Sequence, residues 1–361
     1  MEYTKLKYIN QYKSKSINPA KTPDTIFEMY SVPIYATGHP EYLRGDEIAS
    51  NKAIVRKNDI LLCKINPRIN RVWVVSDESG KQNIASSEWI VIRNSEYNPE
   101  FLAWYFRTPK FQKFMTSEIT GIGGSLTRAQ PKCVAEYPVP VLNRKKQDEI
   151  VNILDKCKLV IDSRKRELLE LDNIIKARFV EMFGDININD KHWECEPLGE
   201  LCTIVRGGSP RPIEQFLGGD VPWIKIGDAT DGDNIYLSST KEHIIQEGVK
   251  KSRLVKAGSL IFANCGVSLG FARIITFDGC IHDGWLAMEG IDERLDKVFL
   301  LQALNQMTEH FRAIAPAGTQ PNLNTAIMKA YKQVIPPIEL QRDFIRFVKQ
   351  VNKSKFINQL L

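Results

Sequence analysis

A short polar stretch, residues 64–71 (KINPRINR), carries the side chains best suited to contact a polyanion. The stretch lies between two apolar runs and its polar residues alternate with apolar ones, so it is predicted to form the tip of a β-hairpin. Lys and Arg supply phosphate contacts, whereas Arg, Lys and Asn also hydrogen-bond to base edges. The candidate nucleic-acid contacts here are Lys64, Asn66, Arg68, Asn70 and Arg71. The alternative is an ordinary solvated hairpin.

A second candidate is a glycine-rich segment, residues 121–128 (GIGGSLTR). Glycine lets the backbone approach a phosphate closely, and the neighbouring hydroxyl and guanidinium groups can bind one. Its candidate contacts are Ser125, Thr127 and Arg128. A similar segment in the second half of the chain, residues 318–323 (GTQPNL), offers Thr319, Gln320 and Asn322.

A run of positive charge lies between these two segments. Five cations follow one another without an intervening acid: Lys250, Lys251, Arg253, Lys256 and Arg273. Such a run is typical of an edge that faces phosphates, and a solvated surface explains it equally well. Lys250, Lys251 and Arg253 are included among the candidate contacts.

The sequence lacks the motifs of enzymes that modify nucleic acids. An amino-methyltransferase needs an Asn/Asp-Pro-Pro-aromatic segment, but Ile335-Pro336-Pro337-Ile338 has neither the amide nor the ring. There is no P-loop, no acid two positions before a lysine as in a nuclease core, and no metal-ligand spacing among the five histidines. His282-Asp283 resembles a catalytic pair without a nearby nucleophile, and packing or hydrogen-bonding beside Trp285 is the favoured interpretation.

One structural unit occurs twice along the chain. Residues 57–64 match residues 257–264, and residues 71–76 match residues 271–276, both at an offset of 200 positions. Further matches follow in the same order: residues 89–92 with 285–288, 101–114 with 298–311 and 121–126 with 318–323. Finally, Pro138-Val139-Pro140 with Gln147 falls opposite Pro336-Pro337 with Gln341. Each copy has short β-rich runs, then an amphipathic helix (101–114 or 298–311), then a Pro-bounded extended segment. We therefore predict two tandem mixed α/β units of the α+β class.

The two copies differ in the chemistry of one loop. Where the first copy has residues 64–71, the second has residues 264–270 (NCGVSLG), which are smaller and uncharged. Asn264 and Ser268 are the candidate contacts of this loop. Two copies of one scaffold with different loop side chains would read different half-sites of a two-part target.

A long helix is predicted after each copy. Residues 147–183 contain no Gly or Pro, and apolar side chains recur at alternating steps of four and three: Ile150, Leu154, Cys157, Ile161, Leu168, Leu171, Ile175 and Met182. The pattern restarts at residue 341 with Phe344, Val348 and Val351 at the same phase. At about 1.5 Å per residue the first helix would extend roughly 55 Å, which suits a spacer. Heptads alone favour a homodimeric coiled coil, but their recurrence favours two antiparallel helices packed within one chain.

Composition sets the broad class of the protein. A length of 361 residues exceeds the size at which a single hydrophobic core usually stops growing, so two domains are expected. A content of 43% hydrophobic and 25% charged residues is typical of a soluble globular protein. The sequence shows no signal peptide or membrane span, and its seven cysteines form no C-x-x-C pair, so reduced thiols in the cytoplasm are expected. A net charge of +6 is compatible with a polyanionic partner but too small to establish one.

The second copy resembles a known family. Five segments carry the resemblance: WECEPLGEL (193–201), GGSP (207–210), VPWIKIGD (221–228), GTQPNLN (318–324) and PPIELQ (336–341). Together they are similar to the specificity subunits of type I restriction-modification enzymes. The first copy departs from the pattern because it lacks the Trp and Gly-Gly-Ser-Pro opening, and the final helix is shorter than the first.

This resemblance implies an organisation and a function. Residues 1–146 and 186–340 would be two target-recognition domains, and residues 147–185 and 341–361 two helices packing as an antiparallel coiled coil. The chain would bind double-stranded DNA, with Lys225 among its contacts, and dock methyltransferase and restriction subunits without catalysing a reaction itself. It would hold no metal or cofactor, because S-adenosylmethionine and ATP with Mg²⁺ would bind the partner subunits.

Two other functions remain open from the sequence. One is an enzyme that modifies nucleic acids through an unrecognised site. The other is a coiled-coil adaptor without affinity for DNA. A methylation assay on the purified chain tests the first, and a salt-dependent DNA titration tests the second.

Overall fold

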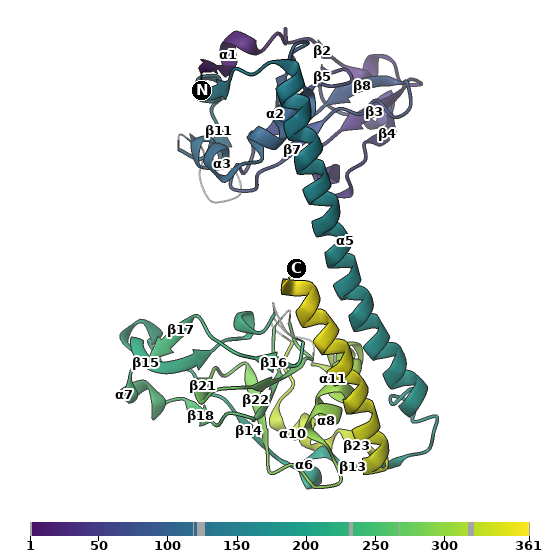
Figure 1. The fold of residues 1–361 in the computed structure, drawn as a ribbon, viewed down its shortest axis with the longest axis vertical. Coiled ribbons are helices and arrows are strands. Elements are labelled where there is room, and N and C mark those ends of the chain that lie inside the picture. Colours follow the sequence, from purple (N-terminus) through teal and green to yellow (C-terminus); the bar gives the residue numbers. More distant parts are fainter. Residues whose placement is uncertain are drawn as a thin grey trace. The chain divides into compact units, whose positions relative to one another are not determined.

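The computed structural model describes residues 2–117, 119–120, 127–230, 234–266, 268–316 and 321–360, without the side chains of 356–360. The chain divides into two compact units, Met1–Asp162 and Ser163–Leu361. Each contains strands and helices, as the ribbon in Figure 1 shows, so the mixed α/β character predicted for both copies is confirmed.

The first unit is built from short strands. They are β1 (Tyr3–Lys5), β2 (Ser16–Ile17), β3 (Ile26–Tyr30), β4 (Glu41–Arg44), β5 (Lys52–Ile54), β6 (Ile60–Cys63), β7 (Val72–Val74), β8 (Gln82–Ala85), β9 (Trp89–Ile92), β10 (Ile119–Thr120), β11 (Arg128–Ala129) and β12 (Pro138–Pro140). Its helices are α1 (Leu6–Ile9), α2 (Pro99–Phe106), α3 (Pro109–Met115), α4 (Pro131–Val134) and the first part of α5 (Arg144–Phe183). The strands form a five-stranded sheet (β2-β5-β8-β3-β4), a three-stranded sheet (β7-β6-β9) and two strand pairs.

The second unit also has two main sheets, of five and four strands, where the first unit has sheets of five and three strands. Its strands are β13 (Glu194–Pro197), β14 (Thr203–Arg206), β15 (Leu217–Ile224), β16 (Tyr236–Leu237), β17 (Glu242–Ile244), β18 (Arg253–Val255), β19 (Leu260–Ala263), β20 (Ala272–Ile275), β21 (Gly279–Ile281), β22 (Trp285–Glu289) and β23 (Lys332–Ile335). Its helices are α6 (Leu198–Leu201), α7 (Gln246–Val249), α8 (Lys297–Gln306), α9 (Thr308–Ile314), α10 (Thr325–Ala330) and α11 (Ile338–Leu360). The sheets are β14-β22-β19-β20-β16 and β17-β15-β21-β18, with the pair β13-β23.

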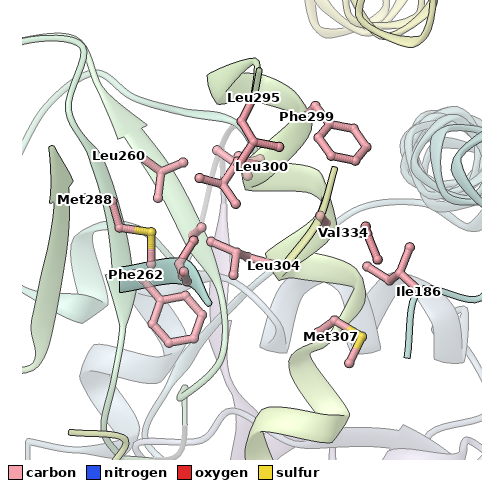
Figure 2. Packing of buried hydrophobic residues seen from close by; sticks show 14 of the residues in the cluster. Ile186, Leu260, Phe262, Met288, Leu295, Phe299, Leu300, Leu304, Met307 and Val334 are labelled. Atoms are coloured by element: carbon pink, nitrogen blue, oxygen red, sulfur yellow. The ribbon is translucent and has the colours of Figure 1, made fainter. Parts of the chain in front are cut away.

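One core cluster of the second unit contains residues of the central sheet, of its helices and of the last part of α5. Leu260, Phe262 and Met288 of β19 and β22 belong to the same buried cluster as Leu300 and Leu304 of α8. Figure 2 shows these side chains lying close together. Alternation along the two strands sends Ile261 and Ala287 into a separate cluster on the other face. The central sheet is thus covered on both faces.

The amphipathic helix expected in each copy is in fact two helices, which corrects the sequence prediction. In the first unit α2 ends at Phe106 and α3 begins at Pro109, with Thr108 as the N-cap of α3. Proline has no N–H to continue the helical ladder, so it starts a new helix instead. In the second unit α8 and α9 are separated at Met307.

The backbone of the two units matches at special positions. Asn58 and Gly258, 200 positions apart, both adopt left-handed conformations, with φ of 71° and 85°. Asn66 and Gly266 do the same, with φ of 46° and 76°. Asparagine and glycine tolerate this region better than other residues. The duplication seen in the sequence is therefore repeated in the turns before and after β6 and β19.

The units differ at one sheet edge. In the second unit β14 pairs with β22 along four residues. Among the described residues of the first unit no strand pairs with this edge of β9, and Asn10 takes the place of one. The Asn10 amide donates to the Val91 carbonyl (3.0 Å), and its side-chain oxygen accepts from the N–H of Arg93 (3.0 Å). A cavity of about 290 Å³, lined in part by Lys64, lies along β9. This difference coincides with the missing Gly-Gly-Ser-Pro opening.

The long helix α5 begins at Arg144 rather than Gln147 and runs to Phe183. Ile150 packs partly buried against the core of the first unit, as the first residue of the predicted seam. Further along, Cys157 and Ile161 are exposed. Leu154 and Leu168 are partly buried. The predicted seam is therefore not continuously buried.

Within the second unit the last part of α5 lies beside α11 (Figure 1). Phe179 and Phe344 pack edge to face, Arg178 lies over the ring of Phe347, and Asp172 pairs with Lys355. The residue numbers of the contact partners increase along α11 as they decrease along α5, so the two segments run antiparallel. The other seam residues of this part are buried or packed against the core: Leu171, Ile175, Met182, Val348 and Val351.

Candidate nucleic-acid interface

The structure joins the two predicted loops of the first unit. Residues 64–71 connect the antiparallel strands β6 and β7, as a hairpin should. The Asn66 N–H donates to the Thr127 carbonyl (2.8 Å), and the Ala129 N–H donates to the Lys64 carbonyl (2.9 Å). The bridge between Ile65 and Arg128 belongs to the same contact. Segments far apart in sequence thus form one surface.

The side chains of this surface have different roles. Arg68 is exposed, and within the described ranges its guanidinium has no hydrogen-bond partner. The Asn70 amide donates to the Phe106 carbonyl (3.0 Å), and Arg71 lies 3.8 Å from the sulfur of Cys63, so both help to hold the hairpin. Arg128 forms an ion pair with Glu88 (3.0 Å). Of the hairpin candidates, Arg68 is the one best placed to meet a ligand.

The glycine-rich segments are described only in part. Ser125, Thr319 and Gln320 lie outside the described residues. Thr127 is buried, with 6% of its surface exposed, and therefore contributes its backbone to the hairpin contact. Asn322 is partly buried and forms the corresponding contact of the second unit.

The second unit joins its two loops in the same way. Cys265 bridges Asn322, and the Leu323 N–H donates to the Asn264 carbonyl (2.8 Å). The Asn264 amide donates to the Leu323 carbonyl (3.1 Å) and to the Asn322 side chain (3.2 Å). Asn264 is fully buried, so it ties the loops together and is not positioned to read a base. Ser268 is partly exposed.

The basic run does not form one exposed edge. Lys250, Lys251 and Arg253 are exposed, and Lys251 lies over the ring of Phe216. Lys256 pairs with Asp278 (2.7 Å).

Arg273 differs from the other cations of the run because it is buried, with 8% of its surface exposed, and its guanidinium donates to the Ala272 carbonyl. All four residues of β20 are buried, so the face of the strand that carries Arg273 is covered as well as the opposite face. Lys225 forms an ion pair with Glu242 and is partly exposed.

His282 and Asp283 form a close pair without the geometry of a hydrolytic triad. The His282 Nε2 lies 3.0 Å from the Asp283 carboxylate, and that carboxylate also accepts from the Ser209 hydroxyl (2.8 Å). A nucleophilic serine would bond to the imidazole rather than to the acid. Burial lowers the pKa of His282 from its ordinary value, although the Asp283 charge opposes this shift. His282 packs against Trp223, at 5.6 Å between ring centres.

Sequence reasoning missed a group of polar residues around Asp283. Arg206, Ser209 and Arg211 all bond to this residue. They lie more than 70 positions from it in the sequence, so spacing alone offered no signal. The Gly-Gly-Ser-Pro motif did mark their segment, although only as a family resemblance.

The comparisons with known proteins address the family. Residues 190–361, nearly half of the chain, match the family model described as the type I restriction modification DNA specificity domain. Residues 190–361 belong to this specificity family. The match confirms the resemblance seen in the second copy.

A curated relative supports the same family. The chain is 22% identical to the specificity subunit of the type I restriction enzyme MjaIX from Methanocaldococcus jannaschii, over 187 residues. This alignment covers 47% of the chain and 40% of the relative, so the chain spans less than half of that protein's length.

Solved structures are similar to this chain in fold over almost its whole length. One, described as the basis of complex assembly and conformational transition of the type I restriction-modification system, has a TM-score of 0.58 and 18% identity. It covers 99% of this chain and 91% of that one. The S subunit of a type I system from M. genitalium has a TM-score of 0.52 and 14% identity, with coverage of 99% and 91%.

Among the described residues, none of the helices is both long and apolar enough to cross a membrane. Likewise, no group of three or more His, Cys, Asp or Glu side chains in the described ranges is arranged to hold a metal ion.

Proposed function

We propose that this chain is a non-catalytic DNA-specificity subunit that reads a two-part target, one half-site per unit. The observation that carries this proposal is the repeated loop junction. In both units a hairpin loop is bridged to a distant segment, Ile65 to Arg128 and Cys265 to Asn322. The scaffold is the same, but the loop side chains differ. That is the design expected of two readers with different specificities.

The proposed domain organisation follows the sequence prediction. Residues 1–146 and 186–340 are the target-recognition domains, and residues 147–185 and 341–361 the helices that space them. The antiparallel contacts between the end of α5 and α11 support this arrangement. We extend them to a coiled coil that fixes the distance between half-sites.

The proposed partners supply the chemistry. The chain binds double-stranded DNA and docks methyltransferase and restriction subunits, which bind S-adenosylmethionine and ATP with Mg²⁺. The His282–Asp283 pair supports a non-catalytic role because Ser209 bonds to the acid and not to the imidazole. The protein acts in the cytoplasm, where its target DNA and partners are.

Two assays test the proposal against its alternatives. Methyl transfer to DNA by the purified chain alone would contradict a non-catalytic role and favour an unrecognised enzyme. In a titration of duplex DNA at several salt concentrations, affinity should fall linearly with salt on logarithmic axes. A chain that does not bind duplex DNA at low salt would instead be a coiled-coil adaptor.

A further inference from the structure

The hairpin loop of the second unit lacks the cations of its counterpart. Arg68 and Arg71 of the first unit correspond to Ser268 and Phe271, 200 positions later. A unit that binds DNA needs cations near its reading loops, because phosphate contacts supply most of the affinity. The charge of the second unit must therefore come from another part of its fold.

Two arginines, one on β14 and one in the segment after it, bond to Asp283, which lies in a turn that packs on this loop. Arg206 ends β14, opposite Leu286 of β22, and Trp285 of β22 in turn pairs with Ala263 at the start of the loop. The turn before β22 packs on the loop itself: a Cβ atom at Gly284 would lie 3.1 Å from the Cys265 sulfur. In the part of the first unit that the structure describes, no strand takes this position, and its loop carries its own cations.

Asp283 organises the group. Its carboxylate accepts from the Ser209 hydroxyl (2.8 Å), lies 3.0 Å from His282 Nε2, and is 3.5 Å from the Arg211 guanidinium. Its backbone carbonyl accepts from Arg206 Nε (3.0 Å). Because Arg206 bonds to a carbonyl rather than to the carboxylate, its charge is not neutralised there. Its terminal nitrogens have no partner in the part of the chain that the structure describes.

Tight backbone packing holds the arginine-bearing segment in place. A Cβ atom at Gly207 would lie 2.1 Å from the His282 carbonyl oxygen, and one at Gly208 would lie 2.9 Å from that of Lys251. The Ser252 hydroxyl donates to the Gly208 carbonyl (2.7 Å). Any side chain at Gly207 would therefore separate Arg206 from Asp283. The same packing brings the exposed cations Lys250, Lys251 and Arg253 next to this segment.

We propose that Arg206, Ser209 and Arg211 form the DNA-phosphate site of the second unit and that Asp283 positions them. A guanidinium binds a phosphate through two parallel hydrogen bonds, and the Ser209 hydroxyl can add another. Arg211, 81% exposed and only loosely paired, can exchange the carboxylate for a phosphate. Asp283 does not touch DNA. This inference rests on the proposed function and adds the residues that anchor one half-site.

A salt titration of the full chain with a fluorescent duplex tests the site. A plot of log affinity against log salt has a negative slope. In the double variant R206A/R211A this slope should become less steep by about two, near 0.9 for each phosphate contact that is lost. The matched control is R342A/R346A, which removes two exposed arginines of α11 that pair with acids on their own helix. Its slope should stay that of the wild type.

Asp283→Asn separates positioning from simple charge. Removing a negative charge should tighten binding if only net charge matters. If Asp283 positions the arginines, binding should weaken severalfold despite the more positive protein.

The outcomes are distinct. If the wild type binds and R206A/R211A behaves like its control, the phosphate site is refuted and the proposed function stands. If Asp283→Asn binds more tightly, the positioning role is refuted. If the wild type does not bind duplex DNA, the proposed function itself fails. Circular dichroism checks that Asp283→Asn is folded, and if it is not, R206A/R211A decides alone, since both side chains are exposed.

Discussion

The side-chain carbonyl of Gln147 accepts a hydrogen bond from the backbone N–H of Asn98 at 2.7 Å. Asn98 caps α2, and Gln147 is buried in the first turn of α5. Gln341 makes the same bond to the N–H of Asp296 (2.8 Å), which caps α8. In both units a buried glutamine therefore joins the start of the long helix to the cap of a core helix.

Replacing either glutamine should destabilise its own unit. Gln147→Ala or Gln341→Ala leaves a backbone N–H without its partner, at a cost of about 1–3 kcal/mol. Urea unfolding of the full chain measures the loss. The control is Gln350→Ala, an exposed position of α11, which should change stability by less than about 0.5 kcal/mol. Equal effects at all three positions would contradict a joining role.

Glu28 should make the first unit sensitive to acid. Its buried carboxylate accepts from Tyr30 (2.7 Å), from the Ser79 hydroxyl (2.6 Å) and from two backbone N–H groups. Burial alone would raise its pKa, but these hydrogen bonds outweigh burial and hold it below the ordinary 4.5. The stabilisation is therefore present above pH 4.5 and is lost as the pH falls through the lower, folded-state pKa.

Glu28→Gln should reveal this contribution. At pH 7 the variant should be less stable by about 2 kcal/mol, because a charged acceptor is lost from a buried network. The difference from wild type should shrink below pH 4.5. Glu96→Gln, at an exposed site of the same unit, is the control and should show no such pH dependence. A constant difference from pH 3 to 7 would rule out the carboxylate as its source.

Recognition should be modular. Replacing Arg68 or Arg128 should relax the first half-site only, and replacing Gln320 or Asn322 the second only, by about 1–3 kcal/mol for each base contact that is lost directly or through a displaced loop. Sequencing the methylated sites of strains that carry each variant with its partner subunits would show this. Arg166→Ala, exposed on α5, should leave both halves unchanged. Relaxation of both halves by a first-unit change would mean that the units do not read independently.

The length of α5 should set the gap between half-sites. Seven residues inserted near Lys158, in its exposed middle, keep the heptad phase and add about 10 Å. At about 3.4 Å per base pair this allows up to roughly three extra pairs, and fewer if α11 must follow the longer helix.

The methylated sites of the insertion strain should keep both half-sites and widen the gap between them. An equal insertion after Gly38, where the chain turns in open space, is the control and should not alter the gap. An unchanged gap with full activity in the α5 variant would refute the spacer.

Local periodicity explains what the sequence determined by itself. Steps of three and four predicted α5, the two apolar runs that flank residues 64–71 predicted β6 and β7, and matches in the same order at nearly constant offset predicted the duplication. These features depend on residues close together in the chain, so one sequence suffices to find them. Pro109 also marks a helix start, although the amphipathic pattern of residues 101–114 predicts a single helix.

Contacts between distant residues were decided by tertiary structure alone. Nothing in the spacing shows that Arg128 meets Glu88, that Asn264 is buried, or that Ser209 bonds to Asp283. A side chain's role depends on its partner and its exposure, which follow from the path of the whole backbone. The sequence therefore marked candidate DNA contacts, and only the fold separated the exposed Arg68 from the candidates that hold the loops together. Only the fold, too, drew attention to Arg206, which the sequence pattern had not marked.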